Sequence, residues 1–305
     1  YEKSKELCQT SLSTSRHLGD RENVAFSLIN LGFVSYVLGE YAEAKKFSQE
    51  GLAIYRDLVD QSGVALCLNS LGNVARSAEE HIEARQLYQE CLAIRREVGD
   101  VYGTATALNN LGNIAEALGE YVEARKLYQE GLSICQRIGY QLGIAASLTN
   151  LGYVAWKCGE LAEAKRLHGE SLDLKMELGD RRSILVSLIN LGEATCSLGE
   201  YQESKKHLSK ALKMAMEIRL APLAVEVLIG IASLLTRSGK KENAVELCAF
   251  ILHYPASRKE LQDRAAGLFT ELTPQLPPEI VAAAKAQALA WTLEEVLAVV
   301  LAILE

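Results

Sequence analysis

The sequence repeats itself at intervals of 40 residues, and this period constrains the fold more than any other feature. A leucine–glycine pair marks each repeat at residues 31–32, 71–72, 111–112, 151–152 and 191–192. A second series in the same phase consists of Tyr41, His81, Tyr121, Leu161 and Tyr201. Self-similarity at such a period indicates stacked supersecondary units, each of which contacts mainly its neighbours. The sequence therefore predicts an array of repeats with a binding surface, not a closed globule with a catalytic pocket.

Both halves of each repeat are predicted to be helical. In the repeat from residue 61 to residue 100, apolar or small residues recur at spacings of three and four in each half, which is the pattern of an amphipathic helix. Glycines that can end a helix in the left-handed conformation follow most of the halves. They are Gly19, Gly39, Gly99, Gly119, Gly139, Gly159, Gly179 and Gly199. Each repeat is thus predicted to be a helix–turn–helix hairpin.

The glycine of each leucine–glycine pair falls inside the first helix of its repeat. Glycine costs about 1 kcal/mol relative to alanine at such a position. A closely approaching neighbouring helix would explain why it is kept. We expect the small residues of the second helix to lie across this contact. These residues are Ala44, Ala84, Ala124 and Ala164.

These features resemble the tetratricopeptide repeat family, whose pattern is a leucine–glycine pair in the first helix and small and aromatic residues in the second. In one repeat, residues 111–112 with Ala124, Tyr128 and Gly131 match those places. The 40-residue length is similar to the long variety in kinesin light chains, in G-protein-regulating spindle adaptors, and in the C-terminal regions of bacterial STAND-type signalling ATPases and transcription regulators. The resemblance covers residues 1 to about 254. It implies an all-α, right-handed superhelical solenoid that holds its ligand in a concave groove.

The phase of the repeat defines the expected segments of the chain. They are the second helix of a truncated repeat at 1–20, five repeats at 21–220, a diverged terminal repeat at 221–254 and a helical C-terminal cap at 255–305. Because residues 1–20 align with residues 41–60, we expect the array to continue upstream, and upstream domains in a parent protein. The cap is predicted to contain helices at 258–272, 278–290 and 292–304, and Thr292 with Glu295 fits a capping box.

Asparagine recurs on the face of the first helices that packing leaves free. In one column it occupies Asn30, Asn110, Asn150 and Asn190, although it is a poor residue inside a helix, by about half a kcal/mol relative to alanine. A primary amide donates and accepts hydrogen bonds, so a ladder of amides could satisfy the backbone of an extended peptide. Alternatively, each amide bonds to a neighbouring helix and orders the stack. Both roles could hold together.

The complete set of expected peptide-binding residues lies on this face. The set is Asn30, Asn69, Asn73, Asn109, Asn110, Asn113, Asn150, Asn190, Phe33, Tyr36, Arg76, Tyr153 and Trp156. Its aromatic members are expected to be exposed anchors beside the amides, although Phe33 and Tyr36 could instead shield the start of the groove. Family members that bind acidic C-terminal tails use lysine and arginine here. The corresponding column has no lysine, so a free acidic C-terminus is not the expected ligand.

Composition and motifs exclude several functions. The net charge of −7 argues against nucleic acid as a ligand, and the longest strongly apolar run, residues 296–304, is too short to cross a bilayer. The seven cysteines lack metal-ligand spacing and are expected to be buried small hydrophobes in a reducing, cytoplasmic protein. The five histidines are scattered, and the zinc-protease, phosphate-loop and nucleophile-elbow motifs are absent. We therefore expect no enzyme activity, no cofactor and no metal.

The sequence as a whole predicts an interaction domain that binds a protein or an extended peptide. We expect it to be the sensor or scaffold part of a larger bacterial signalling protein. A freestanding adaptor of the kinesin-light-chain kind is the alternative. A self-association module is a third, because the helix at residues 1–19 and the apolar helix at 292–304 could stack head to tail.

Overall fold

The computed structural model describes residues 2–255 and 257–304, and within these ranges every regular element is a helix. Tyr1, Ala256 and Glu305, which belong to the expected first and last segments, lie outside the described residues. The helices are α1 (Glu2–Leu18), α2 (Arg21–Val37), α3 (Tyr41–Asp57), α4 (Gln61–Ser77), α5 (His81–Glu97), α6 (Val101–Ala117), α7 (Tyr121–Arg137), α8 (Gln141–Lys157), α9 (Leu161–Leu178), α10 (Arg181–Ser197), α11 (Tyr201–Ile218), α12 (Ala221–Arg237), α13 (Lys241–His253), α14 (Lys259–Leu272), the 3-10 helix η1 (Thr273–Gln275), α15 (Pro278–Ala290) and α16 (Leu293–Leu304).

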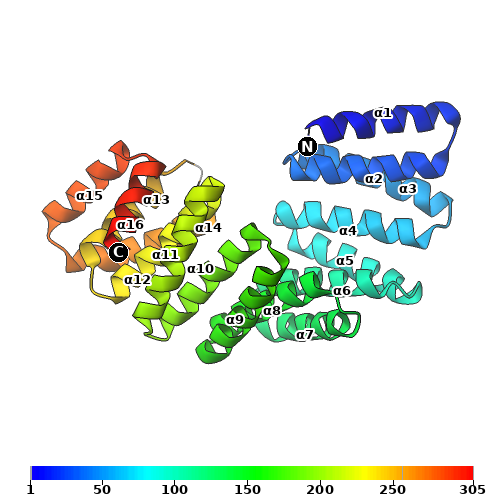
Figure 1. Ribbon diagram of the computed structural model, residues 1–305. Coiled ribbons are helices and arrows are strands. Elements are labelled where there is room, and N and C mark those ends of the chain that lie inside the picture. Colours follow the sequence, from blue (N-terminus) through cyan, green and yellow to red (C-terminus); the bar gives the residue numbers. More distant parts are fainter. Residues whose placement is uncertain (1, 256, 305) are drawn as a thin grey trace. The chain divides into compact units, whose positions relative to one another are not determined.

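The predicted all-α solenoid of helix–turn–helix hairpins is confirmed. Within each unit, consecutive helices of the repeats pack side by side, from α1 to α7 in the first and from α9 to α13 in the second (Figure 1). The even-numbered helices α2 to α12 are the first helices of their repeats, and the odd-numbered helices α1 to α13 are the second helices. The segment bounds inferred from the repeat phase stay a prediction.

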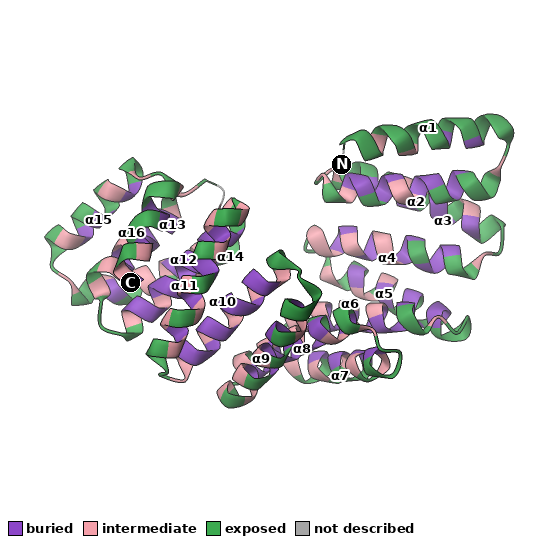
Figure 2. Ribbon diagram, viewed as in Figure 1, coloured by how far each residue is buried: buried purple, intermediate pink, exposed green. Residues whose placement is uncertain are grey.

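The chain divides into two compact units, and each is described by itself. Unit 1 comprises Tyr1–Asn150 and unit 2 comprises Leu151–Glu305. In unit 1, α3 packs between α2 and α4, and α5 packs between α4 and α6. In unit 2, α12 packs against both α10 and α14. The first helices carry more buried residues than the second helices (Figure 2), because they pack between second helices, and α2 also contacts α4 while α10 contacts α12.

Local capping explains where the helices begin and end. An aspartate precedes four of the first helices and accepts a hydrogen bond from a backbone N–H of the first turn, which satisfies one of the donors left free there. These aspartates are Asp20, Asp60, Asp100 and Asp180. The glycines predicted to follow the helices all have positive φ, as expected. Val59, Glu79 and Arg219 adopt the same left-handed conformation without being glycine.

The mid-helix glycines make room for the second helix, and at Gly32 the backbone oxygen of Ala44 lies across the contact, 3.4 Å from where a Cβ atom would be. A Cβ atom on Gly112 would lie 2.4 Å from the ring of Tyr128, and one on Gly72 would lie 2.6 Å from the ring of Tyr88. The side chain that comes closest is the one sixteen positions later in all five repeats: Ser48, Tyr88, Tyr128, His168 and Leu208. Ala44, Ala84, Ala124 and Ala164 are buried, but larger neighbours fill the notches. The glycines thus admit whole rings against the backbone of the first helix.

The C-terminal helices close unit 2. The predicted capping box is present, because the backbone N–H of Thr292 donates to Glu295 Oε2 at 2.8 Å and the backbone N–H of Glu295 donates to Thr292 Oγ1 at 3.3 Å. Val296 and Val300 of α16 are fully buried, and α16 packs on α11 and α12. The apolar side of this helix, which motivated the idea of stacking through the chain ends, is therefore covered within unit 2.

Burial of the cysteines differs from the expectation at two positions. Cys67, Cys91, Cys135, Cys196 and Cys248 are buried as expected, whereas Cys158 is exposed and Cys8 is half-buried. All seven are free thiols.

Candidate functional site

Four asparagine side chains gather on the first-helix face of unit 1. Asn69 and Asn73 lie one turn apart on α4, and Asn109 and Asn113 lie at the equivalent places on α6. All four are half-buried. We call them the four-amide cluster. The sequence analysis had included all four among the expected peptide-binding residues.

Buried tyrosines hold two of these amides. The hydroxyl of Tyr88 donates to Asn73 Oδ1 at 2.7 Å, and the hydroxyl of Tyr128 donates to Asn113 Oδ1 at 2.7 Å. Burial raises the pKa of Tyr88 to about 12, so its hydroxyl keeps its proton near neutral pH. The rings that fill the glycine notches of α4 and α6 thus also fix the direction of the amides.

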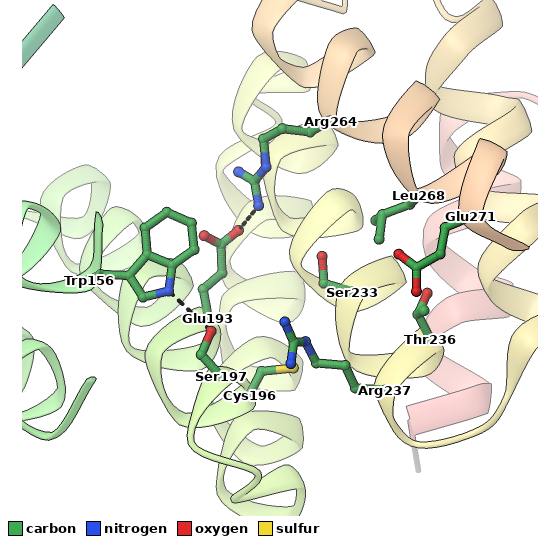
Figure 3. Close-up of a pocket in the computed structure, with 10 residues that line it drawn as sticks. All are labelled: Trp156, Glu193, Cys196, Ser197, Ser233, Thr236, Arg237, Arg264, Leu268 and Glu271. Carbon is green, nitrogen blue, oxygen red and sulfur yellow. Dashed lines mark hydrogen bonds and ion pairs between the residues drawn. The ribbon is translucent and has the colours of Figure 1, made fainter. Parts of the chain in front are cut away.

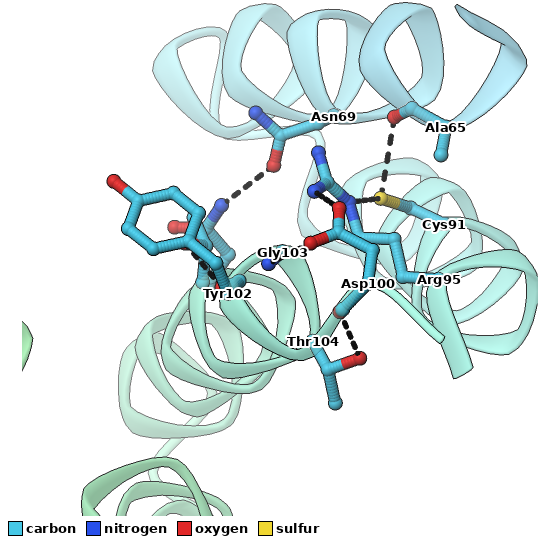
Figure 4. Close-up of polar contacts among 10 residues, drawn as sticks. Ala65, Asn69, Cys91, Arg95, Asp100, Tyr102, Gly103 and Thr104 are labelled. Carbon is cyan, nitrogen blue, oxygen red and sulfur yellow. Dashed lines mark hydrogen bonds and ion pairs between the residues drawn. The ribbon is translucent and has the colours of Figure 1, made fainter. Parts of the chain in front are cut away.

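Neighbouring first helices hold the other two amides. Asn69 Oδ1 accepts from Nδ2 of Asn110 at 2.9 Å (Figure 4), and Asn109 Oδ1 accepts from the hydroxyl of Ser147 at 3.2 Å. The oxygen atoms of all four amides are therefore occupied within unit 1.

The nitrogen atoms of the four-amide cluster remain available. None of them donates a hydrogen bond to another of the described residues, and none is buried without a partner. Each amide nitrogen carries two hydrogens. The cluster therefore presents N–H donors to solvent, which suits the carbonyl oxygens of an extended chain.

The column of Asn30, Asn110, Asn150 and Asn190 is not a uniform ladder. Asn110 donates to Asn69, and Asn150 Nδ2 donates to Asn113 Oδ1 at 3.3 Å, so both tie their helix to the preceding first helix. Asn30 and Asn190 are half-buried, and their side chains make no hydrogen bond to other described residues. The alternative role, in which the amide bonds to a neighbouring helix and orders the stack, thus fits Asn110 and Asn150.

The aromatic residues of unit 1 differ in exposure. Phe33 is 59% exposed, whereas Tyr36 is half-buried and shares a hydrogen bond of 3.1 Å with Ser77. Arg76 Nη2 donates to the Tyr36 hydroxyl at 3.4 Å. Of these residues, only Phe33 meets the expectation of an exposed aromatic anchor.

Tyr153 and Trp156, the expected aromatic anchors in unit 2, are both half-buried. Nε1 of Trp156 donates to Ser197 Oγ at 3.1 Å, which repeats the Tyr36–Ser77 relationship in another pair of first helices (Figure 3). The ring centroids of Tyr153 and Trp156 lie 6.0 Å apart, and Lys157 Nζ lies 5.2 Å from each. Such a cation over two rings stabilises their arrangement by about 1 kcal/mol.

An ion pair crosses the first-helix face of unit 2. Arg264 of α14 lies 2.5 Å from the carboxylate of Glu193 of α10, and both side chains are largely covered. The sequence analysis did not identify this pair, because α14 follows the last repeat and shares no periodic relationship with α10. The positive charge of Arg264 was therefore not expected on this face.

A buried arginine in unit 1 has a structural role. Arg95 is 7% exposed and donates to Asp100 Oδ2 at 2.6 Å and to Cys91 Sγ at 3.2 Å (Figure 4). Gly103 leaves it room, since a Cβ atom there would lie 1.5 Å from Arg95 Nη1. Glycine recurs at residues 63, 103 and 143, a signal in the sequence that marks such contacts between second helices and the next first helices.

Membrane spans and clusters of metal-binding side chains are absent from residues 2–255 and 257–304. No helix there is long and apolar enough to cross a membrane. The same residues contain no group of three or more histidine, cysteine or acidic side chains arranged to hold a metal ion.

Sequence comparison finds one family. The tetratricopeptide repeat profile matches residues 27–97, 63–137, 103–177 and 143–217, which together span more than half of the chain. No curated protein matches the sequence.

Solved structures with the same fold are more distant in sequence. BtubC (BKLC) from P. vanneervenii superposes with a TM-score of 0.63 at 21% identity, over 72% of this chain and 92% of that one. A chain of the APC/C hetero-tetramer Cut9–Hcn1 gives a TM-score of 0.66 at 15% identity, over 88% of this chain and 46% of the other. The Rap conjugation gene regulator of plasmid pLS20, solved with the Phr* peptide, gives 0.60 at 14% identity, over 83% and 76%. These likenesses establish the fold.

Proposed function

The chain belongs to the tetratricopeptide repeat family, whose fold generally mediates protein–protein interaction, and on that premise we propose that the first-helix face of unit 1 binds an extended segment of peptide or protein. The four-amide cluster supplies the main contacts. Its nitrogens donate to backbone carbonyl oxygens of the bound segment, and Phe33 offers an exposed apolar contact on α2 of the same face.

The observation that carries this proposal is the polarity of the cluster. All four amide oxygens are engaged inside unit 1, while the four nitrogens have no partner among the described residues. Backbone carbonyl groups are present at every residue of a peptide, so contacts to them give affinity without dictating sequence. Specificity must then come from side-chain contacts elsewhere on the face.

Exchange of asparagine for aspartate tests this arrangement with little change of shape. Asn73→Asp with Asn113→Asp keeps an oxygen to accept from Tyr88 and Tyr128, removes the donors and places negative charge against carbonyl oxygens. Binding of the purified chain to an array of random immobilised dodecapeptides is the measurement. We expect the double variant to lose at least about tenfold in affinity for the peptides that the unchanged protein binds, or ~1.4 kcal/mol.

Asn243→Asp on α13 is the control for each of the two exchanges, because it adds one negative charge outside unit 1, as Asn73→Asp and Asn113→Asp each do within it. It should leave the array pattern unchanged. Equal binding by the double variant and the control would show that the four-amide cluster does not hold the ligand.

In its wider context, we propose that this binding serves as the sensor or scaffold function of a larger bacterial signalling protein in the cytoplasm. The resemblance of the repeats to those of signalling ATPases supports it, and the free buried thiols are compatible with a reducing compartment. The alternative is a freestanding adaptor, supported by the likeness of the fold to BtubC (BKLC). Sequencing the genomic reading frame around this chain separates the two, because a nucleotide-binding module would favour the first.

Self-association has less support than these alternatives. Self-association was suggested by two helices at the chain ends, and one of them, α16, packs on α11 and α12. Light scattering over a hundredfold range of concentration tests the remaining possibility, and a monomer throughout would exclude it.

A further inference from the structure

A cavity of about 300 Å³ opens on the first-helix face of unit 2, apart from the four-amide cluster. Helices α8, α10, α12 and α14 all contribute to its lining (Figure 3). Trp156 borders it on α8, and Leu268 borders it on α14. The volume is at the lower end of the range for ligand pockets, so it suits a single residue of a longer ligand.

Two of the charged groups in this pocket neutralise each other. Glu193 and Arg264 form the ion pair across α10 and α14, and the carboxylate of Glu193 is the more deeply covered of the two. The pair as a whole carries no net charge, so it attracts a charged ligand little. It also holds α14 against the repeat face and so fixes the far side of the pocket.

Arg237 is the charged group that remains on the α12 side. Its side chain has no ion pair or hydrogen bond with any other residue in 2–255 or 257–304. Its guanidinium group projects between α10 and α12, beside Cys196 (Figure 3). Ser197 holds the place 40 residues earlier, so the two side chains line the same edge of the pocket.

The hydroxyl groups of the pocket differ in what they can offer. Ser197 Oγ accepts from Trp156, so its own hydrogen is free to be donated. The hydroxyls of Ser233 and Thr236 donate to carbonyl oxygens of their own helix, at 3.0 and 2.8 Å, so they offer a ligand only lone pairs. Of the three hydroxyls, only Ser197 therefore offers a donor, and the guanidinium of Arg237 adds N–H donors that no carboxylate of the described residues engages, unlike that of Arg264, which is paired with Glu193.

We propose that this pocket of unit 2 binds the side chain of an aspartate or glutamate residue of a peptide ligand, with its carboxylate between Arg237 and Ser197. The inference rests on the peptide-binding function proposed above and adds to it a preference for an acidic residue. Planar guanidinium groups match carboxylates in a two-pronged geometry, which favours arginine for such recognition.

The second acidic group of the pocket lies away from this edge. Glu271 of α14 points toward Thr236, on the other side of the pocket from Arg237 (Figure 3). Its carboxylate can accept the backbone N–H of the same ligand residue. The pocket thus has a donor side for the carboxylate and an acceptor side for the backbone, which a neutral or basic residue would match less well.

The indole N–H signal of Trp156 provides a direct reporter, because Trp156 bonds to Ser197, and Trp291 supplies an internal reference outside the pocket. The probe is N-acetyl-glutamate amide, which has a side-chain carboxylate but no terminal one. Titrated to about 50 mM against the full chain, it should shift the Trp156 signal and leave Trp291 unmoved. N-acetyl-glutamine amide, of the same shape without the charge, should shift it at least about tenfold more weakly.

Two variants complete the experiment. Arg237→Gln should abolish the response to the glutamate probe, whereas Arg182→Gln, an exposed arginine of α10 outside the pocket, should retain it. Equal responses to the two probes, no response to either, or an unchanged response in Arg237→Gln would each overturn the proposal. So would a response confined to N-acetyl-alanine with its free terminal carboxylate.

The outcome can be separated from that of the peptide-binding proposal. Asn73→Asp with Asn113→Asp changes unit 1 only and should leave the Trp156 response intact. Loss of array binding in that variant with a normal Trp156 response supports both proposals. If the unchanged protein binds no peptide on the array but gives a normal Trp156 response, the proposed carboxylate pocket is supported and the proposed peptide-binding function is contradicted.

Discussion

The hydroxyl of Tyr128 donates a 2.7 Å hydrogen bond to the side-chain oxygen of Asn113. The ring of the same tyrosine lies where a side chain on Gly112 would have to be. The packing notch of the repeat and the amide of the proposed binding face are therefore coupled through a single side chain. The same relationship joins Tyr88 to Asn73 in the preceding repeat.

Tyr128→Phe is expected to separate the two roles of this residue. The ring still fills the notch, but Asn113 loses its tyrosine donor, so the free energy of unfolding should fall by about 1 kcal/mol. Binding to the peptide array should weaken by about fivefold, because the amide is no longer held in one direction. Urea unfolding and array binding measure the two effects. Tyr102→Phe, which removes an exposed tyrosine hydroxyl bonded to Tyr140, should leave binding unchanged.

Asn110→Ala with Asn150→Ala should destabilise unit 1. Both side chains donate to amides of the preceding first helix, so their removal is expected to cost about 1 kcal/mol each and lower the melting temperature. Thermal unfolding followed by circular dichroism checks this. A melting temperature equal to that of the unchanged protein, together with weaker array binding, would instead assign these two asparagines to the ligand.

Val59→Gly should stabilise the protein. Val59 has a φ of +58°, where Gly99 has +72° at the same place in the next repeat. A left-handed conformation costs a side chain with a branched Cβ about 1–2 kcal/mol, so glycine should raise the free energy of unfolding by about 1 kcal/mol. Chemical unfolding in urea provides the measurement. Val98→Gly is the control and should lower the free energy of unfolding. Val98 has a φ of −81°, so no strain is relieved, and glycine only adds conformational entropy to the unfolded chain.

His168→Phe should make unit 2 resistant to mild acid. His168 is 2% exposed, and burial, assisted by the charge of Lys175, lowers its pKa to about 4. In the unfolded chain the histidine has its ordinary pKa of 6.5, so above that pH the ring is neutral in both states and the protein has its full stability. It is lost as the pH falls toward 4, by on the order of 3 kcal/mol.

Melting temperatures at pH 7 and pH 5, followed by circular dichroism, test this prediction. Phenylalanine fits the same notch as Tyr128 in its repeat and does not titrate, so the variant should lose less stability between the two pH values. Replacing the exposed His17 by glutamine should leave the acid sensitivity unchanged. An equal loss in His168→Phe and in the unchanged protein would contradict the assignment.

Several features of the fold followed directly from the residues. The period gave the hairpins, the glycines gave most of the helix ends, and Thr292 with Glu295 gave the start of α16. The aspartates before the first helices and the glycines at 63, 103 and 143 carried further signals in the same phase. The expectation about Ala44 and its equivalents did not name the side chains that fill the notches, because spacing along a helix identifies a face but not which side chain on that face reaches farthest.

For the candidate site, too, the sequence predicted one part and the packed structure supplied the other. Periodicity alone placed Asn69, Asn73, Asn109 and Asn113 on one face, because a 40-residue repeat brings equivalent positions of successive first helices together. Which end of each amide faces solvent depends on hydrogen bonds made by tyrosine, serine and asparagine side chains from other helices. Only the packed structure supplies those contacts.

The 40-residue repeat by itself determined the solenoid and placed the residues of the proposed binding face at equivalent positions of successive first helices, since both depend on the period. The tertiary structure decided the chemistry of that face. It directed the amide nitrogens outward in unit 1, and it brought Arg264 of α14 to Glu193, leaving Arg237 without a partner in unit 2. The contact of Arg264 with Glu193 joins residues with no periodic relationship, so its geometry is set by packing in three dimensions and not by spacing along the chain.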